Sequence, residues 1–399
     1  MAIGWVSIMK EIHFILLSLK LLLIIFLLPI PSFAQEWPVI APQELIPKKE
    51  EGVYFRPYVS MHDYGTTLEN DNRYIVGLAV EKVRKDYFNL NLNIINSVEG
   101  TQQAYTGITD FLLPWGDTFI TYGGWTSLRS GLASQMDMEG EAWQISPRYL
   151  IPLPEIIKGV INSVELGLDI KETDNLFDQR ATVLAPLPEQ IFQLNGFYEV
   201  DFTDFMGDTD ASILLVYSPG GVSEANSDAR FQTLRQNARS NYFYGEFNFN
   251  KNFNLPLNFY LFEQFDYQFS TAALPDQEQL DLGGWETIRG YDESLASGDQ
   301  GFFFNSELHF PLFSFTKLIN MEKFNDEVDF FLFIDYGRVF SLDQLPELSP
   351  SLSLGSTGFG VNYSLMTNFY IRYFFGFQFI EAPVQQSDNR GHILMVLSF

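Results

Sequence analysis

Arg289 lies near the centre of a turn-rich stretch, Leu274 to Pro311, and its chemistry can be stated before its surroundings are known. A guanidinium forms forked, charge-assisted hydrogen bonds with carboxylates, which fix a loop in place and break no bond. Acids follow at Glu307 and Asp335, in two segments where polar and apolar residues alternate. The residues therefore predict a loop held by an ion pair, and the rest of the chain must bring its partners within reach.

Residue types suited to catalysis or cofactor binding are sparse. The histidines are His13, His62, His309 and His392, and the chain has no Cys, which excludes disulfides and thiolate metal sites. No zinc-protease, Gly-x-Ser-x-Gly, phosphate-loop or calcium-loop pattern occurs. His309 stands near Glu307. We interpret it as a lumen-facing histidine that is hydrogen-bonded to this acid, which is a simpler explanation than a catalytic base. The sequence predicts no enzyme, no cofactor and no metal site.

The composition favours a protein that crosses a membrane with strands. The chain has 399 residues, of which 16% are aromatic, including 39 Phe and 19 Tyr. After Ala34 no apolar run is long enough for a membrane-spanning helix. The lipid-facing side and interfacial girdles of a β-barrel consume aromatic residues while its lumen stays polar. The net charge of −26 argues against nucleic acid as a partner. At this point an aromatic-rich soluble β-sandwich is the alternative.

The N-terminus has the features of an export signal. A hydrophobic stretch follows Lys10 and ends in small residues, so we expect a signal peptide over residues 1–34 that is cleaved after Ala34. Translation starts either at Met1 or at Met9, and the second start would give a signal of ordinary length. A retained anchor helix is the alternative, against which Pro29 interrupts the hydrophobic stretch.

Beyond the signal we expect a periplasmic linker over residues 35–52 and one domain over residues 53–399. The domain is predicted to be all-β, a barrel of sixteen antiparallel transmembrane strands of about ten residues, the length a tilted strand needs to cross a bilayer. The expected strands are 53–61, 73–83, 86–96, 103–113, 117–128, 140–151, 162–172, 190–202, 210–218, 240–250, 256–270, 301–312, 327–339, 354–364, 367–379 and 390–399.

The links between these strands alternate in length. Every second link is mostly short, such as 114–116 and 365–366, whereas intervening links such as 173–189 and 271–300 are longer and more polar. An outer-membrane barrel sorts its connections in this way, and a soluble sandwich has no reason to do so. The last strand ends on Phe399 and should pair with the first, because an open strand edge is costly in lipid.

Alternation within two strands predicts which side chains face the lumen. In one strand the inward set is Asn305, Glu307 and His309, and in the next it is Phe331, Phe333, Asp335 and Gly337. The predicted loop arginine and the acids would therefore meet inside the barrel.

These residues also carry a family resemblance. The matching segments are Gln264 and Gln268, LPDQEQ at 274–279, LGG at 282–284, TIRGY at 287–291, GDQG at 298–301, NSE at 305–307 and FIDYG at 333–337. In this order the chain resembles the Omp85 superfamily, and within it the two-partner-secretion transporters of the haemolysin secretion/activation (TpsB) type. The resemblance is weak in the first half of the barrel and strong from about Gln264.

The resemblance implies that the sixth outer loop, residues 271–300, folds into the lumen. It assigns Arg289 to Asp335 as an ion-paired lock, with Glu307 as the adjacent acid, and we expect lumen water to screen the pair. The expected loop 6 motif is Gly283, Gly284, Thr287, Ile288, Arg289, Gly290, Tyr291, Gly298, Asp299 and Gly301. The expected wall partners are Asn305, Glu307, Phe333, Asp335 and Gly337, and Phe399 is the expected assembly signal.

The function implied by the resemblance is an outer-membrane transporter of a diderm bacterium that secretes or inserts a polypeptide, with loop 6 plugging the lumen. The implied partners are outer-membrane lipid, the barrel assembly machinery and a secreted polypeptide. The resembled transporters carry periplasmic POTRA domains, for which residues 35–52 are too few, so a separate periplasmic recognition protein is a further expected partner. The alternatives are a general diffusion pore or nutrient channel, and an acidic surface-exposed structural or adhesin barrel.

Overall fold

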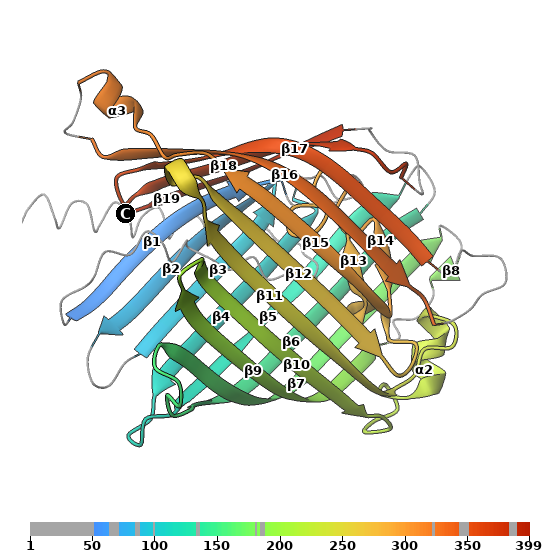
Figure 1. Ribbon diagram of the computed structural model, residues 1–399. Helices are drawn as coiled ribbons and strands as arrows, with labels where there is room; N and C mark the ends of the chain where they lie inside the picture. Colours follow the sequence, from blue (N-terminus) through green and yellow to red (C-terminus); the bar gives the residue numbers. More distant parts are fainter. Residues whose placement is uncertain are drawn as a thin grey trace, which may run out of the picture.

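The computed structural model describes residues 52–63, 72–83, 88–98, 100–132, 136–179, 182–183, 188–320, 324–342, 351–382 and 389–399. Within them, sixteen long antiparallel strands form one sheet that closes into a barrel, with a two-residue strand, β8 (Thr182–Val183), beside β7 (Val160–Gln179) (Figure 1). This confirms the predicted fold. No helix in these ranges is both long and apolar enough to cross a bilayer. The expected signal peptide and nearly all of the expected linker lie outside the described residues.

All sixteen predicted strands are present. They and β8 are β1 (Gly52–His62), β2 (Arg73–Val83), β3 (Phe88–Ser97), β4 (Gln102–Leu112), β5 (Thr118–Leu132), β6 (Met136–Pro152), β7 (Val160–Gln179), β8 (Thr182–Val183), β9 (Glu189–Asp204), β10 (Gly207–Pro219), β11 (Asn241–Asn254), β12 (Tyr260–Ser270), β15 (Gln300–His309), β16 (Asp326–Phe340), β17 (Ser351–Leu365), β18 (Phe369–Gln378) and β19 (Asn389–Ser398). The end of the barrel that carries short links such as 205–206 and 366–368 is called the turn end below, and the opposite end the loop end.

The barrel closes where β19 pairs with β1, as the amphipathic last strand predicts. Five residue pairs form this seam, beginning with Tyr58 opposite Ser398, whereas the neighbouring β1–β2 ladder has eleven. The amide of Phe399 continues the pairing by donating a hydrogen bond to the carbonyl oxygen of Pro57 at 3.0 Å. The last residue of the chain is therefore part of the closure.

Alternation along β16 separates an outer from an inner face as predicted. Leu332 and Ile334 are about half exposed on the outside, while Phe333 and Asp335 are buried on the inside. An apolar outer face suits lipid, and a polar inner face suits a lumen that holds a folded-in loop. The same register therefore delivers both the membrane surface and the side chains of the inner wall.

Some strands reach further at the loop end than predicted. β7 continues to Gln179, opposite Met136 of β6, so that much of the link expected at 173–189 is strand. Residues 173–179 are mostly polar, and a paired hairpin satisfies their backbone without an apolar face. The alternation of apolar residues predicts only the lipid-facing part of a strand, whereas the hydrogen-bonded ladder of β6 and β7 continues beyond that part.

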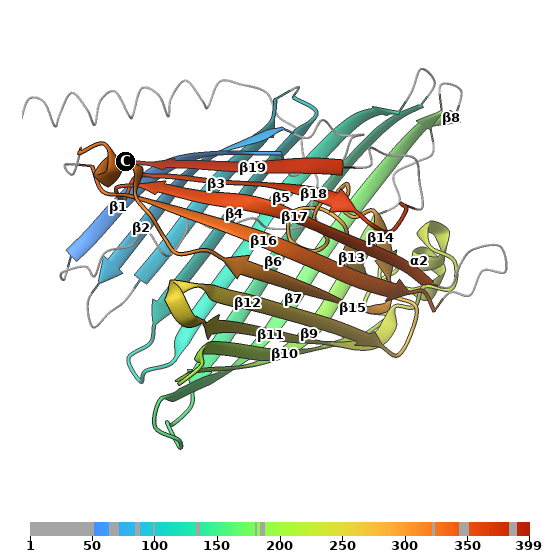
Figure 2. The same cartoon turned by 45° about the horizontal axis from the view of Figure 1, so that its top comes forward.

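Two loops at the loop end shape the lumen. Loop 5, residues 220–240, contains α2 (Asp228–Leu234). Loop 6, residues 271–299, contains the short helix η4 (Asp276–Glu278) and a hairpin of β13 (Leu280–Leu282) and β14 (Ala296–Gly298). Figure 2 shows this hairpin inside the ring of strands. At the turn end, η3 (Pro256–Asn258) and α3 (Phe315–Leu318) lie in the links that precede β12 and β16.

Candidate functional site

The tip of loop 6, residues 283–293, is a compact turn built by local hydrogen bonds. The Gly283 amide donates to Thr287 Oγ1 at 2.9 Å, and the Gly284 amide donates to the carbonyl oxygen of Ile288 at 3.2 Å. Gly284 has φ +100°, and a Cβ there would collide with the Glu293 carboxylate. Such a conformation is open to glycine and strained for other residues. The Gly-Gly pair therefore folds the tip so that Arg289 points at the wall.

Arg289 makes a forked contact with Asp335 of β16. Its Nε and Nη2 donate to the two carboxylate oxygens at 2.8 and 2.6 Å, and its own backbone amide donates to Oδ2 at 3.0 Å. The remaining Nη1 donates to Glu307 of β15. The guanidinium carbon lies 3.9 Å from the ring centre of Phe333. The structure thus brings together the arginine and three of the five wall residues that the sequence predicted around it.

This ion pair is more deeply buried than the expectation of screening by lumen water implies. The side chain of Arg289 is 4% exposed and that of Asp335 is 0% exposed. Phe331, Phe333 and Phe374 form a buried aromatic cluster beside the pair, and these rings come from two strands, β16 and β18. Without water between them, opposite charges attract more strongly, but each costs more to leave unpaired.

The charges around Arg289 determine its electrostatics. Burial disfavours the charged form of Arg289, but Asp335 and Glu307 outweigh this effect and raise the pKa of the guanidinium. Glu307 is shared, because Arg372 of β18 donates to it at 2.8 Å and His309 Nε2 lies 2.9 Å from it. Asp335 serves the tip alone, through three donors of Arg289. Asp335 is therefore the acid on which the tip depends most.

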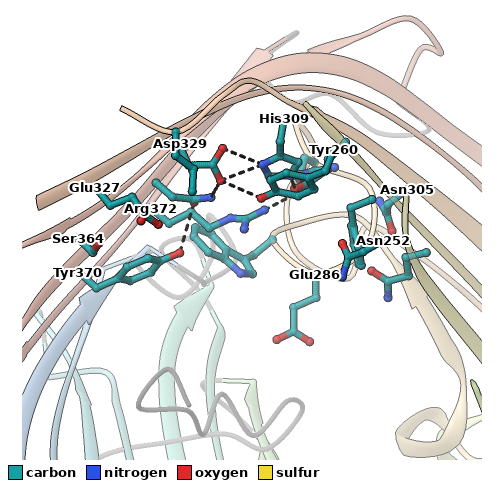
Figure 3. Close-up of a pocket in the computed structure, with 17 residues that line it drawn as sticks. Asn252, Tyr260, Glu286, Asn305, His309, Glu327, Asp329, Ser364, Tyr370 and Arg372 are labelled. Carbon is teal, nitrogen blue, oxygen red and sulfur yellow. Dashed lines mark hydrogen bonds and ion pairs between the residues drawn. The ribbon is translucent and has the colours of Figure 1, made fainter. Parts of the chain in front are cut away.

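His309 links the ion pair to a second acid, Asp329 of β16. Its Nδ1 lies 2.8 Å from Asp329, and its ring stacks on Tyr260 with 4.1 Å between ring centres (Figure 3). The sequence predicted an inward histidine bonded to Glu307, and that contact is present. The contact with Asp329 was not predicted, since it depends on how two strands are registered.

A cavity of about 760 Å³ opens on the turn-end side of the tip. Figure 3 shows the Asp329–His309 group on one wall, and Glu286 of the tip standing apart from it. The surrounding barrel wall reduces the solvation of the Glu286 carboxyl and raises its pKa. The cavity is lined by Asn252, Tyr260, Phe262, Gln264, Trp285, Glu286, Arg289, Asn305, Glu307, His309, Leu312, Glu327, Asp329, Asn362, Ser364, Tyr370 and Arg372. Most of these come from the turn-end halves of β11 to β18, so the tip forms the inner end of a vestibule.

The other predicted motif residues also lie at the contact between loop and wall. Tyr291 donates through its hydroxyl to the carbonyl oxygen of Gly355 at 2.7 Å, and Asn305 donates to the carbonyl oxygen of Thr287. At Gly337 a Cβ would lie about 3 Å from Leu282 and Ile288, so this glycine leaves room for the loop. Gly298 and Gly301 closely approach the β16 backbone, and Asp299 lies in the base of the loop. Of the predicted set, only Phe399 lies away from this contact, at the barrel seam.

Sequence reasoning missed Gly376 of β18. A Cβ at Gly376 would lie 2.6 Å from the Cα of Gly290, so the loop backbone touches the strand backbone. The signal was present as a lone glycine among aromatics in YFFGFQF, since a strand glycine often marks a close backbone approach. Trp285, Glu278 and Arg372 were also not assigned a role, because nothing in their spacing identifies their partners.

Gly376→Ala is expected to push the tip off the wall. The clash is with loop backbone, which a rotamer change cannot relieve, so the tip amides around Ile288 should exchange with solvent at least about tenfold faster. Hydrogen exchange followed by mass spectrometry measures this. Gly196→Ala in β9 is the matched control, because a Cβ there meets nothing within 4 Å. Equal exchange in wild type and Gly376→Ala would show that the approach does not matter.

Comparison with known proteins agrees with this architecture. The family of haemolysin secretion/activation proteins ShlB/FhaC/HecB matches residues 158–362. An outer membrane transporter CdiB from Dickeya dadantii (strain 3937) is 31% identical over 91 residues, which are 23% of this chain and 15% of that protein.

Solved structures show the same fold at low identity. CdiB from Escherichia coli superposes with a TM-score of 0.73 at 14% identity, covering 92% of this chain and 64% of that one. CdiB from Acinetobacter baumannii gives 0.64 at 16% identity, with 86% and 60% covered. BamA from Haemophilus ducreyi lacking POTRA domains 1–3 gives 0.58 at 12% identity, with 88% and 71% covered. The chain thus spans less than two thirds of either CdiB structure. Because the family match covers half of the chain, which also has the predicted sixteen-stranded barrel and in-folded loop, the chain belongs to the haemolysin secretion/activation protein family ShlB/FhaC/HecB.

Proposed function

We propose that this chain is an outer-membrane transporter that secretes a polypeptide, and that the tip of loop 6 closes its lumen. Family membership and the likeness to CdiB, which is named an outer membrane transporter, support the general role. The observation that carries the closing role is the forked contact of Arg289 with Asp335, which ties the tip to the inner wall. A loop held in the lumen by a buried ion pair is costly to displace, and it therefore suits a closed state.

The expected targeting features fit this role. Residues 1–34 would direct export and be cleaved after Ala34, and residues 35–52 would form a periplasmic linker to the barrel. The turn end would then face the periplasm and the loop end the outside, as in outer-membrane barrels. Phe399, whose amide bonds to Pro57 across the seam, would be read by the barrel assembly machinery.

In this proposal the polypeptide enters the vestibule from the periplasm, delivered by a separate recognition protein. The vestibule offers aromatic rings and amides, such as Tyr260, Asn305 and Asn362, to an extended chain. A polypeptide that binds in the vestibule competes with the loop 6 tip for the space in the lumen. The tip can be displaced only if Arg289 leaves Asp335. A ligand can shift this equilibrium only by its preference for the displaced state. Loosening of the short β1–β19 seam is the other route by which a polypeptide could pass, towards the lipid.

Co-expression with a candidate substrate tests the proposal. A large secreted polypeptide encoded by a neighbouring gene is expected in the medium when this chain is present, and inside the cell when it is absent. Arg338→Ala, which changes an exposed arginine on the outer side of β16, is a control that should export normally. Retention of every candidate polypeptide, together with free passage of small solutes, would instead identify a diffusion pore.

A further inference from the structure

Asp299, at the end of loop 6, forms hydrogen bonds with three segments at the loop end of the barrel: loop 5, the start of loop 6 and the link after β16. Its carboxylate accepts hydrogen bonds from Arg235 Nη1 at 2.6 Å and Nη2 at 2.9 Å, from the Leu274 amide at 2.7 Å and from the Leu342 amide at 2.6 Å. The side chain is 0% exposed. With two donors at each oxygen, the carboxylate is fully satisfied, and its charge is balanced by one buried guanidinium. Asp299 therefore fixes the start and end of loop 6 to each other and to the link after β16.

Arg235 brings loop 5 into this group. Its backbone amide caps α2 by donating to the carbonyl oxygen of Phe231 at 2.9 Å. Phe231 is fully buried among apolar residues that include Val216 of β10 and Leu274 of loop 6. Figures 1 and 2 show α2 at the end of the barrel opposite the C-terminus. Loop 5 thus packs against the barrel wall, and through Arg235 it binds the end of loop 6 at Asp299.

Glu278 is a second anchor, on a different wall. It accepts from Lys171 of β7 at 2.6 Å, from Gln193 of β9 at 2.7 Å and from Tyr244 of β11 at 2.8 Å. Its side chain is 1% exposed. Gln268 of β12 donates to the carbonyl oxygens of both Glu278 and Asp299, at 3.1 and 3.2 Å. The two anchors are therefore joined to each other.

We infer that loop 6 consists of a fixed base and a separately movable tip, and that Asp299, Arg235 and Glu278 are the positioning residues of the base. The base comprises residues 272–282 and 294–299, and the tip residues 283–293. The side chains that bind the tip through polar contacts lie on β15, β16, β18 and β19. The side chains that bind Asp299 and Glu278 of the base lie on loop 5, β7, β9, β11 and β12. Gly283 has φ +110° and Ser294 has φ +50°, so left-handed residues stand where the two parts meet.

The consequence concerns how the lumen opens. Release of Arg289 would free the tip from its ion pair, while Asp299 and Glu278 keep the base in place under loop 5. The β13–β14 hairpin of the base packs against β15 to β17, in the same apolar cluster as Ile288 and Tyr291 of the tip, so the tip would move relative to this hairpin. An opening of the channel would then be a local swing towards the turn-end vestibule, and loop 6 would not leave through the loop end. This inference extends the proposed closing role, but its test measures distances and does not depend on what the chain secretes.

Spin-label distances test the two-part loop directly, because the absence of Cys in the whole chain makes introduced cysteines unique. Ile157→Cys, in the turn before β7, is the reference. It is paired with Glu286→Cys for the tip or Ser297→Cys for the base. In Arg289→Ala the tip distance distribution should widen by about twofold or more while the base distribution stays unchanged. In Asp299→Ala the base distribution should widen.

Controls separate local from global effects. Arg239→Ala removes an exposed loop 5 arginine that pairs with Asp228, and it should leave the base distribution as in wild type, whereas Arg235→Gln should widen it. If Asp299→Ala does not fold, Asp299→Asn, which keeps the size of the side chain, replaces it and should widen the base distribution less. A base that widens with the tip in Arg289→Ala would show that loop 6 moves as one body. An unchanged base in both Arg235→Gln and the Asp299 variant would contradict the assignment of the anchors.

Discussion

Asp335→Ala is expected to detach the loop 6 tip, with a loss of about 3–5 kcal/mol of docking free energy, the usual cost of breaking a buried ion pair from one side. Asp335 is fully buried and accepts three hydrogen bonds from Arg289, so its removal takes the acceptor from the backbone amide, Nε and Nη2 and leaves the buried guanidinium with Glu307, which Arg372 shares. Amide exchange in residues 283–293 should accelerate about 100-fold or more, measured by mass spectrometry in detergent.

Glu307→Gln should have a smaller effect on the same amides. Arg289 keeps its fork to Asp335 in this variant, and Arg372, which also loses its acid, is 25% exposed and can be hydrated. Asp266→Ala is the matched control, since this β12 acid accepts from Asn248 and Gln264 and not from the loop. An equal acceleration in Asp335→Ala and Asp266→Ala would mean that the effect is not specific to the tip.

Arg289→Ala is expected to abolish secretion of the partner polypeptide while a normal amount of barrel remains in the membrane. The barrel is closed by backbone ladders in which Arg289 takes no part. Its loss leaves the two buried acids Asp335 and Glu307 without their shared cation, and of its ion pairs with the wall the tip keeps that of Asp292 with Arg390. In the proposed mechanism the polypeptide displaces a docked tip, so secretion should fail when the tip no longer docks. The measurements are the secreted fraction of the partner and sensitivity to a large antibiotic that the outer membrane excludes, which should increase.

Arg289→Lys refines this prediction. An ammonium group cannot reproduce the fork to Asp335 and the third contact with Glu307 at once, so secretion should be partial. Full secretion by Arg289→Ala, with its tip shown to be detached, would show that secretion does not depend on the docked tip and would contradict this part of the proposed mechanism.

The sequence predicted the barrel well because strand periodicity is a local property. The inward set of β16, with Phe333 and Asp335, follows from alternation alone, and the closure by β19 follows from the cost of an open strand edge in lipid. The extent of β7 did not follow, because its polar end has no apolar face to reveal it. Asp169 shows a related limit, since no local pattern reveals that this acid is buried in the wall, where Arg148 of β6 donates to it at 2.6 Å.

The candidate site was predictable only in part. The Arg289–Asp335 contact was expected from the motif and its family resemblance, but not its depth of burial, to which Phe374 of β18 contributes. Arg235 and Asp299 are 64 positions apart in sequence, and no spacing rule joins them before the register of the strands is known. Long-range pairs inside the lumen are set by that register and by the path of loop 6.

Single-channel recording of the purified barrel in planar bilayers tests most directly whether the docked tip closes the lumen. Wild type is expected to stay mostly closed, with small and infrequent currents, because Arg289 holds the tip against Asp335. Arg289→Ala is expected to show large and long-lived openings in the same bilayers. A large, steady conductance that is the same in wild type and Arg289→Ala would contradict the account and identify a permanently open pore.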